Sequence, residues 1–512
     1  MPNTQDDLRQ PQWNVVPSYN SVVYKRGARC YAEDFQGHQL IMSSTSDDQA
    51  VIQAALDKAG RILIKEPLAA NPYTLDNPLD VYSNTWLQGE NWNVELQRTT
   101  GVILRNINFG TVGSDTNIRI SNLAARCTAP TTANDGNIVF DGATNVIVDY
   151  CKSTDSPTEC IKVRSGTRAT FAYNTVERSK INAGTGKAGI MFSAGSGETA
   201  KQCNMIGNHA LDCGGEAFGI NGAATSTHFL TNIIGNTGVI ETSGNRGQIH
   251  LEGSSGSAFQ ANVIGNSIHS DYYGIVAINC QRTAMIGNNI SHFSATDALD
   301  GISIQGASLY HAIVGNTIFT PAEHGIEIIG SSGYASVVGN TIINPSAKTT
   351  DTYSGIAVIP AGAAGLYVNI GHNTIVDNLG GSARMKYGIA LDGSSAAVTS
   401  PNVQDNTIIG AVTAGMLETA TINTPMIRNN IGYVTEARGT GSIASGATTA
   451  VITHGLAYTP VASEINISFT ENPSNTAGTI WIDTITSTQF TVNCENDPGA
   501  SNLDFGWSAR RV

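Results

Sequence analysis

The sequence feature that most constrains the fold is a short motif that returns at nearly regular intervals. A Gly-Asn pair between aliphatic residues appears as NVIGNSI at 262–268, AIVGNTI at 312–318 and VVGNTI at 337–342. Internal repeats of this length are typical of solenoids, in which each repeat packs on its neighbours. The recurring Asn residues are 22 to 34 positions apart and are Asn174, Asn208, Asn236, Asn266, Asn288, Asn316, Asn340, Asn373, Asn406 and Asn429.

A second motif alternates with the first and has the pattern of a strand. It appears as YGIVAI at 273–278, DGISIQG at 300–306 and HGIEIIG at 324–330. Its aliphatic residues fall at every second position, which predicts a strand with one buried face. Each repeat therefore holds at least two short strands joined by Gly-rich turns, with no helical pattern between them. This describes one coil of a parallel β-helix, so the predicted fold class is all-β.

The repeated Asn is predicted to have a structural role. A sharp corner between two strands requires a positive φ, which Gly and Asn tolerate. Identical Asn side chains on successive coils can also hydrogen-bond to one another along the stack. We therefore expect a buried Asn ladder at one corner and assign it no role in binding.

The N-terminal part of the chain predicts a cap for the β-helix. Residues 1–45 are expected to form an N-terminal β element, and the β-helix is expected to span 46–436. Within it, 46–60 predicts a capping helix, because Asp47 is a good N-cap and Gly60 a good stop. The open end of a β-helix needs such a cover over its strand edges.

The C-terminal part changes character after the last repeat. Residues 437–448, rich in Gly, Ser, Thr and Ala, are predicted to be a linker. Five short alternating runs within 449–512 predict a small antiparallel β-sandwich. Because so small a module buries little core by itself, we expect it to act as an oligomerisation module.

Composition excludes several classes of function. The net charge of −13 argues against nucleic-acid binding, because phosphate contacts require a basic face. The first residues are polar, so no secretory signal is expected, and no apolar run is long enough to span a membrane. No Asp-rich calcium loop and no His/Cys metal spacing stands out, so no cofactor is predicted. The eight Cys are expected to be small buried residues, with their bonding left open.

The segments SDDQAVIQAALDKAG, RILIKEP and SNTWLQGE, followed by the Gly-Asn coils, resemble the pectate-lyase-like superfamily of right-handed parallel β-helix proteins. The resemblance covers roughly residues 45–435, and the superfamily includes glycoside hydrolases, polysaccharide lyases, epimerases and viral tailspike depolymerases. The segments THGLAYTP and FGWSARRV are similar to small C-terminal modules of viral fibre and spike proteins. The resemblance implies a polysaccharide substrate, a homotrimer, and a virion or extracellular location.

Catalytic side chains of a β-helix must lie on neighbouring coils, because only stacking brings distant positions together. In a chain with only 13% charged residues, the polar residues of coils 216–327 are the best functional signal. Glycoside hydrolysis requires two carboxyls, about 5–5.5 Å apart in retaining enzymes and about 6.5–9.5 Å apart in inverting ones. Asp300 and Glu327, one coil apart, are the predicted catalytic pair, and Glu252 is the third catalytic candidate. The predicted substrate-binding residues are Arg246, His250, Tyr273, His324, Glu216 and Asp297.

Two alternative functions stay open at this point. A lyase would need a base and a group that neutralises a uronate, which Arg246, His250, Tyr273 and His324 could supply, but the acidic composition disfavours it. A non-catalytic adhesive or structural spike would bind glycan without cleaving it. Polar residues on the wet face of a β-helix are also expected without any function. A second-choice site consists of Asp135, Asp155, Glu159, Lys162, Arg164 and Lys187.

Overall fold

The computed structural model describes residues 19–67, 71–111, 113, 115–129, 136–179, 188–223, 226–239, 247–253, 259–292, 298–330, 333–349, 351–361, 367–378, 385–419, 422–470 and 476–511. The chain divides into two compact units, 1–184 with 189–192 and 203–209, and 185–188 with 193–202 and 210–512. No helix among the described residues is long and apolar enough to cross a membrane.

The first unit begins with an antiparallel β element and a capping helix, as predicted. Strands β1 (Ser21–Arg26), β2 (Arg29–Asp34) and β3 (Gln39–Ser44) pair in succession. Helix α1 (Asp48–Leu56) starts at Asp47, whose side chain accepts a hydrogen bond from the backbone of Ala50 at 2.8 Å. Its apolar stripe is fully buried and comprises Val51, Ile52, Ala55 and Leu56. The helix packs on the β element and on the first strands of the coils.

The rest of the first unit consists of short parallel strands that repeat once per coil. One set comprises β4 (Gly60–Ile64), β7 (Thr85–Gly89), β10 (Thr116–Ser121), β13 (Thr144–Asp149), β16 (Thr170–Ala172) and β20 (Asn204–Ile206). A second comprises β5 (Tyr73–Leu75), β8 (Glu95–Arg98), β11 (Ala124–Cys127), β14 (Lys152–Ser156) and β17 (Thr175–Ser179). A third comprises β6 (Leu79–Val81), β9 (Leu104–Asn106), β12 (Ile138–Asp141) and β15 (Ile161–Arg164). Strands β18 (Ala188–Ala194), β19 (Thr199–Lys201) and β21 (His209–Leu211) follow, where the chain alternates between the two units.

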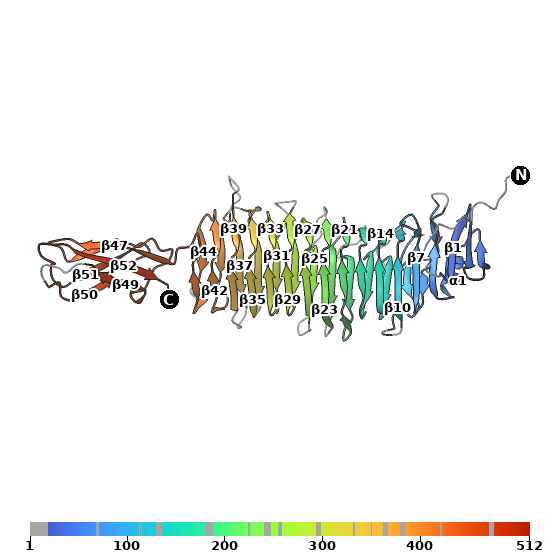
Figure 1. Cartoon of the computed structure of the whole chain (residues 1–512), viewed down its shortest axis with the longest axis horizontal. Helices are drawn as coiled ribbons and strands as arrows, with labels where there is room; N and C mark the ends of the chain where they lie inside the picture. Colours follow the sequence, from blue (N-terminus) through green and yellow to red (C-terminus); the bar gives the residue numbers. More distant parts are fainter. Residues whose placement is uncertain are drawn as a thin grey trace. The chain divides into compact units, whose positions relative to one another are not determined.

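The second unit continues the same pattern in three parallel sheets, which Figure 1 shows as strands lying side by side. The first sheet holds β23 (Thr227–Ile234), β26 (Phe259–Ile264), β29 (Thr283–Ile286), β32 (His311–Val314), β35 (Tyr334–Val338), β38 (Tyr367–Gly371), β42 (Asn402–Gln404) and β46 (Met426–Arg428). The second holds β24 (Thr237–Val239), β27 (Ser267–Ser270), β30 (Asn289–His292), β33 (Thr317–Phe319), β36 (Thr341–Ile343), β39 (Thr374–Val376) and β43 (Thr407–Ile409). The third holds β22 (Glu216–Gly222), β25 (Ile249–Glu252), β28 (Ile275–Ile278), β31 (Ile302–Gln305), β34 (Ile326–Gly330), β37 (Ser354–Pro360), β40 (Tyr387–Leu391) and β44 (Ala414–Glu418). A small pair, β41 (Val398–Thr399) and β45 (Ile422–Asn423), joins the last coils.

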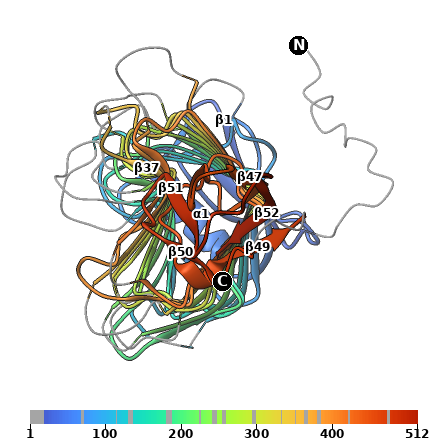
Figure 2. The ribbon, with the colours of Figure 1, turned by 90° about the vertical axis from the view of Figure 1, so that its left-hand side faces the viewer.

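The interior of the coils consists of ladders of identical or similar aliphatic residues. Ile275, Ile302, Ile326, Ile356 and Ile389 are register partners along the third sheet, and all are fully buried. Viewed along the stack, strands of successive coils overlie one another (Figure 2). Because each partner sits one coil from the next, register is fixed by burial of the apolar face.

The glycine of the second motif is required by close packing. A Cβ at Gly301 would lie 2.4 Å from Ile318 Cγ2 and 2.7 Å from the carbonyl oxygen of Gly325. Any side chain at this position would therefore displace the next coil. The glycine of each Gly-Ile pair thus lets the backbones of adjacent coils come close together just before the first inward aliphatic residue of the strand.

The Asn ladder is confirmed, but the hydrogen-bonding Asn and the residue with positive φ are two different, adjacent residues. Asn288 donates its side-chain amide to Asn316 Oδ1 at 2.9 Å, and Asn316 does the same to Asn340. The positive φ lies on the residue before each ladder Asn, such as Gly287 at 62°. The last ladder member is Asn430, and the predicted Asn429 instead takes the positive φ of 55°. The prediction was off by one here because no Gly marks the corner.

The C-terminal module is an antiparallel sandwich, but its boundary differs from the prediction. The five predicted strands are β48 (Thr449–Thr453), β49 (Ile465–Phe469), β50 (Ile480–Asp483), β51 (Gln489–Cys494) and β52 (Leu503–Arg510), and a short 3₁₀ helix spans Ala462–Glu464. The predicted linker 437–448 is wrong over its first half, where β47 (Glu436–Ile443) pairs with β52. A Cβ at Gly439 would lie 2.9 Å from Trp507 Nε1, and one at Gly441 would lie 2.6 Å from Phe505 Cζ. The small residues that looked like a linker instead make room for aromatic rings.

All eight cysteines are buried and none forms a disulfide, which answers the bonding question left open by the sequence. Burial raises the pKa of the Cys151 thiol to about 12. A thiol of this kind is not a nucleophile at neutral pH, because the thiolate is the reactive form. The cysteines therefore act as small packing residues.

Candidate active site

The candidate site lies on the outward face of the third sheet, here called the site sheet (β25, β28, β31, β34, β37 and β40). Its register aligns two outward columns. The first column runs His250, Val276, Ser303, Glu327, Ala357 and Ala390. The second runs Glu252, Ile278, Gln305, Ile329 and Ile359. These columns confirm that residues two dozen positions apart become neighbours.

Asp300 and Glu327 are brought together as a hydrogen-bonded carboxyl pair. Asp300 immediately precedes the Gly-Ile corner of β31 and is 2% exposed, whereas Glu327 lies within β34 and is half-buried. Burial and the neighbouring Glu327 carboxylate raise the pKa of Asp300 well above its usual range. Burial also raises the pKa of Glu327, while hydrogen bonds from Ser303 and Asp300 oppose that rise. Two neighbouring carboxylates repel each other, so the raised pKa values favour a singly protonated pair.

Asp300 and Glu327 each influence the pKa of the other through a side-chain hydrogen bond between them. The arrangement matches carboxyl dyads that titrate as one unit.

A hydrogen-bond chain fixes Glu327 from the other side. Ser303 Oγ donates to Glu327 Oε2 at 3.0 Å and accepts from Gln305 Nε2 at 3.0 Å. Gln305 Nε2 also lies 3.4 Å from the Tyr273 hydroxyl. The chain therefore connects Tyr273, a predicted site residue, to the carboxylate through two residues that were not predicted as site members.

A third carboxylate flanks the pair. Glu323 Oε1 accepts hydrogen bonds from Lys348 Nζ at 3.2 Å and from the Tyr353 hydroxyl at 3.1 Å. Its charge contributes to the raised pKa values of both Asp300 and Glu327. Three acidic side chains thus meet at one place, and the nearby cation Lys348 is paired with one of them.

His324 holds the backbone around Asp300. Its backbone N–H donates to Asp300 Oδ1 at 2.9 Å, and its ring Nδ1 accepts from the backbone N–H of Ser354 at 3.0 Å. Burial lowers the pKa of His324 to about 4, so the ring is neutral at pH 7. Burial also raises the pKa of Tyr273 above its usual range. Tyr273 is therefore a poor base, because its pKa is raised rather than lowered. His324 Nδ1 is already occupied by the hydrogen bond from Ser354.

His250, Glu216 and Glu252 form a second cluster on the same sheet. His250 Nδ1 lies 2.8 Å from Glu216 Oε1, and its Nε2 lies 3.7 Å from Glu252 Oε2. The first column places His250 three register steps from Glu327, which is about 14 Å at ~4.8 Å per step. Glu252 therefore does not join the Asp300–Glu327 pair. Val276 and Ile278 lie between the two clusters.

The remaining predicted residues fall outside this picture. Arg246 and Asp297 lie outside the described residues. In the second-choice site, Arg164 pairs with Asp141 of the preceding coil, and Lys162 lies 3.4 Å from Glu159. Asp155 pairs with Arg126 at 3.0 Å and with Arg178 at 2.6 Å. The Arg164 and Asp155 pairs are cross-strand ion pairs and the Lys162–Glu159 pair is local, while Asp135 and Lys187 lie outside the described residues.

Some residues of the candidate site carry no signal that sequence reasoning could use. Ser303 and Gln305 occupy predicted outward positions, but nothing in their types marks them as partners of a carboxyl. Lys348 and Tyr353 lie in the irregular segment between β36 and β37, where the repeat gives no register. A count of coils, by contrast, was sufficient to place Glu252 three steps from Glu327.

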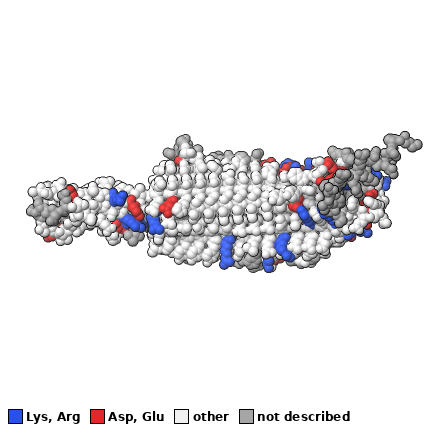
Figure 3. Space-filling model, viewed as in Figure 1, with Lys and Arg blue, Asp and Glu red and all other residues white. Residues whose placement is uncertain are grey.

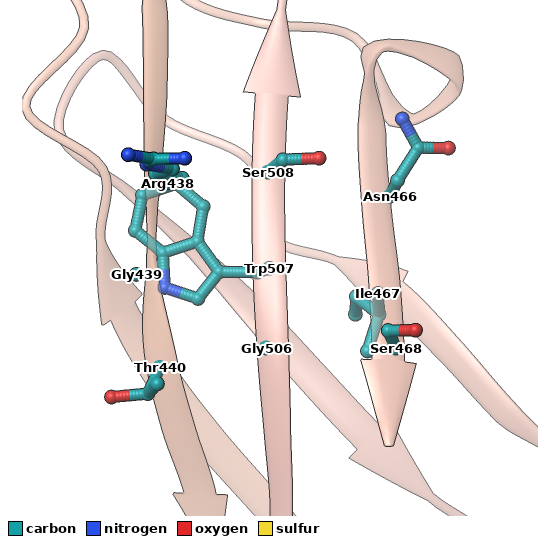
Figure 4. Close-up of a pocket in the computed structure, with 9 residues that line it drawn as sticks. All are labelled: Arg438, Gly439, Thr440, Asn466, Ile467, Ser468, Gly506, Trp507 and Ser508. Atoms are coloured by element: carbon teal, nitrogen blue, oxygen red, sulfur yellow. The ribbon is translucent and has the colours of Figure 1, made fainter. Parts of the chain in front are cut away.

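No group of three or more His, Cys, Asp or Glu in the described ranges is arranged to hold a metal ion. A hollow of about 650 Å³ lies over the sheet of β47, β52 and β49, beside Trp507 (Figure 4). Arg438 is its one charged lining residue, so it lacks the paired acid and base that hydrolysis requires. The titratable groups of the site sheet are therefore the better candidate.

Comparisons with known proteins concern the fold. Residues 247–431 match the model of the family described as "Right handed beta helix region". The fold is a right-handed β-helix. No curated protein matches the sequence.

Three phage tailspikes share this fold at low sequence identity. The tailspike gp61 of Pseudomonas phage phi297 is 11% identical, with a TM-score of 0.60 over 92% of this chain and 93% of that one. The tailspike gp49 of Pseudomonas phage LKA1 is 11% identical, with a TM-score of 0.56 over 91% and 93%. Tailspike protein 3 of bacteriophage CBA120 is 12% identical, with a TM-score of 0.50 over 86% and 63%. The resemblance inferred from the sequence is confirmed at the level of fold.

Proposed function

We propose that the protein binds a polysaccharide and cleaves it by hydrolysis at the Asp300–Glu327 pair. The observation that carries the proposal is the contact of two buried or half-buried carboxyls on adjacent coils, Asp300 and Glu327, with raised pKa values. The pair holds one proton that it can give to the glycosidic oxygen as the bond to the anomeric carbon breaks. It recovers one proton from the water whose oxygen adds to that carbon, so the pair returns to its starting state.

The surroundings of the pair suit this role. Ser303 orients the Glu327 carboxylate, and the backbone N–H of His324 orients Asp300. Tyr273 and His324 border the pair and are proposed to contact the sugar at the cleaved bond. Glu216, His250 and Glu252, about 14 Å along the sheet, are proposed to bind a more distant sugar of an extended chain.

β-Elimination is less well supported. A lyase needs a base for the sugar C–H and a cation for the uronate carboxylate. The described strands from β25 to β40 of the site sheet carry no Lys or Arg. The raised pKa of Tyr273 also keeps its hydroxyl protonated at neutral pH.

The test measures the products of polysaccharide cleavage. We expect new reducing ends without the ultraviolet absorbance of an unsaturated uronate. Product with that absorbance would establish elimination instead. Glycan binding without any product would establish a non-catalytic spike.

We also propose that the protein is a homotrimer on a virion or outside the cell. The fold shared with three phage tailspikes supports this, as does the sandwich, where Val461, Phe469 and Trp481 are 39–58% exposed. Exposed aromatic and aliphatic side chains of this kind are typical of subunit interfaces. Light scattering of the purified chain tests the trimer, and a monomer at micromolar concentration would contradict it.

A further inference from the structure

The charge around the carboxyl pair restricts the sugar that can occupy it. Asp300, Glu323 and Glu327 lie within electrostatic reach of one another. The cation Lys348 is already bonded to Glu323. A uronate, sialate or sulfate group bound here would face the negative charge of the singly protonated pair and of Glu323, whose cation Lys348 is already engaged, and this repulsion costs binding free energy. The face drawn in Figure 3 shows few charged side chains over the stacked strands.

The outward face of the site sheet is unexpectedly aliphatic beside the pair. In the second column Ile278, Ile329 and Ile359 are half-buried, and Gln305 is the polar residue between the first two. Ile329 follows Glu327 by two residues on β34 and so lies on the same face. An outward face that only contacts water is expected to be polar, and these side chains instead offer apolar contacts next to the reacting groups.

We infer that the glycan bound at the pair is uncharged and carries methyl groups, as 6-deoxy or N-acetylated sugars do. This inference rests on the proposed function for the location of the glycan. A methyl group removed from water against an isoleucine strengthens binding about fourfold. The neutral backbone of such a glycan also avoids repulsion by the negative charge of the pair and of Glu323. Together the two features name a substrate class that the fold does not specify.

The test uses the full-length Glu327→Gln variant, which is expected to bind without turnover, on an array of purified bacterial polysaccharides. The array groups them as neutral with deoxy or N-acetyl sugars, neutral without methyl groups, and uronate-containing. We expect binding to members of the first group, at least tenfold stronger than to the other two. Preferred binding to uronate polymers, equal binding to methyl-free glucans, or no binding at all would overturn the inference.

A pair of matched variants locates the apolar contact. Ile329→Ser on the site sheet should weaken binding to the preferred polysaccharide about fourfold for each methyl group it contacts. Ile286→Ser, at a 38% exposed position on β29 of another sheet, should leave binding unchanged. Equal effects of the two changes would also overturn the inference.

The two proposals fail in distinguishable ways. Cleavage of a uronate polymer by hydrolysis at the pair would leave the proposed function standing and refute the neutral substrate. Binding of a neutral, methyl-bearing glycan that the wild-type protein never cleaves would support the neutral substrate class and refute the proposed hydrolysis.

Discussion

The Asn ladder holds adjacent coils in register, so removing one of its side chains tests the stacking that brings Asp300 and Glu327 together. Asn288 Oδ1 accepts hydrogen bonds from the backbone N–H of Asn266 at 3.0 Å and from the side-chain amide of Asn266 at 2.9 Å. Its Nδ2 donates to Val263 O and to Asn316 Oδ1, both at 2.9 Å. Asn288 is 1% exposed, so water has little access to replace these bonds.

The Asn288→Ala change would leave the backbone N–H of Asn266 and one N–H of its side-chain amide without an acceptor, while the other amide N–H keeps its bond to Ile233 O at 2.9 Å. Each buried donor without a partner costs about 1–3 kcal/mol, so the free energy of unfolding should fall by about 2–6 kcal/mol. Asn316 Oδ1 loses less, because it still accepts from the backbone N–H of Asn288. A small cavity in place of the amide adds to the loss.

The neighbouring Asn289 provides a matched control. It is exposed at the start of β30, and Asn289→Ala should change stability by no more than about 0.5 kcal/mol. Both variants and the wild type should be unfolded in guanidinium and followed by circular dichroism. If Asn288→Ala loses no more stability than Asn289→Ala, the ladder does not stabilise the stack and the reasoning fails.

Three further predictions concern protons. Burial and Glu327 raise the pKa of Asp300, so wild-type stability should be lost as pH rises from the ordinary carboxyl range of about 4 toward the raised value. Asp300→Asn should therefore raise the melting temperature at pH 8 but not at pH 4. A lower melting temperature of the variant at pH 8 would count against the shared proton. The Ser303 hydroxyl lowers the pKa of Glu327, so Ser303→Ala should move the pH–activity profile to higher pH, and an unmoved profile would mean that Ser303 does not position the carboxylate. Burial lowers the pKa of His311 to about 4, so wild-type stability should fall as pH drops from about 6.5 toward 4. His311→Leu should reduce this loss of stability, whereas His372→Leu, at a side chain 65% exposed, should show the same loss as the wild type. Equal melting curves of the two variants across this pH range would refute the assignment.

The sequence was sufficient for those parts of the fold that repeat. The Gly-Asn and Gly-Ile motifs reveal the length of each coil, and the alternating aliphatic residues show which face of each strand is buried. The coils and the proximity of Asp300 and Glu327 could therefore be predicted. Register failed by one residue at Asn430, where Asn429 replaces the marker Gly. In the sandwich, Gly439 looked like a linker residue because its partner Trp507 is 68 positions away.

The candidate site was only partly predictable for the same reason. Column counting places carboxyls on adjacent coils, but it does not say whether two of them share a proton, because that depends on burial at the corner before β31. Lys348 and Tyr353, which bond Glu323, come from an irregular segment without any period. Long side chains from such segments reach the site in ways that a repeat does not encode.

The most direct measurement is the rate of reducing-end release from the preferred polysaccharide by wild type, Asp300→Asn and Glu327→Gln. We expect each amide to lower the rate by at least about 10²-fold, since each removes one half of the proton pair, while glycan binding persists. Turnover that survives both changes with the fold intact would contradict catalysis by this pair.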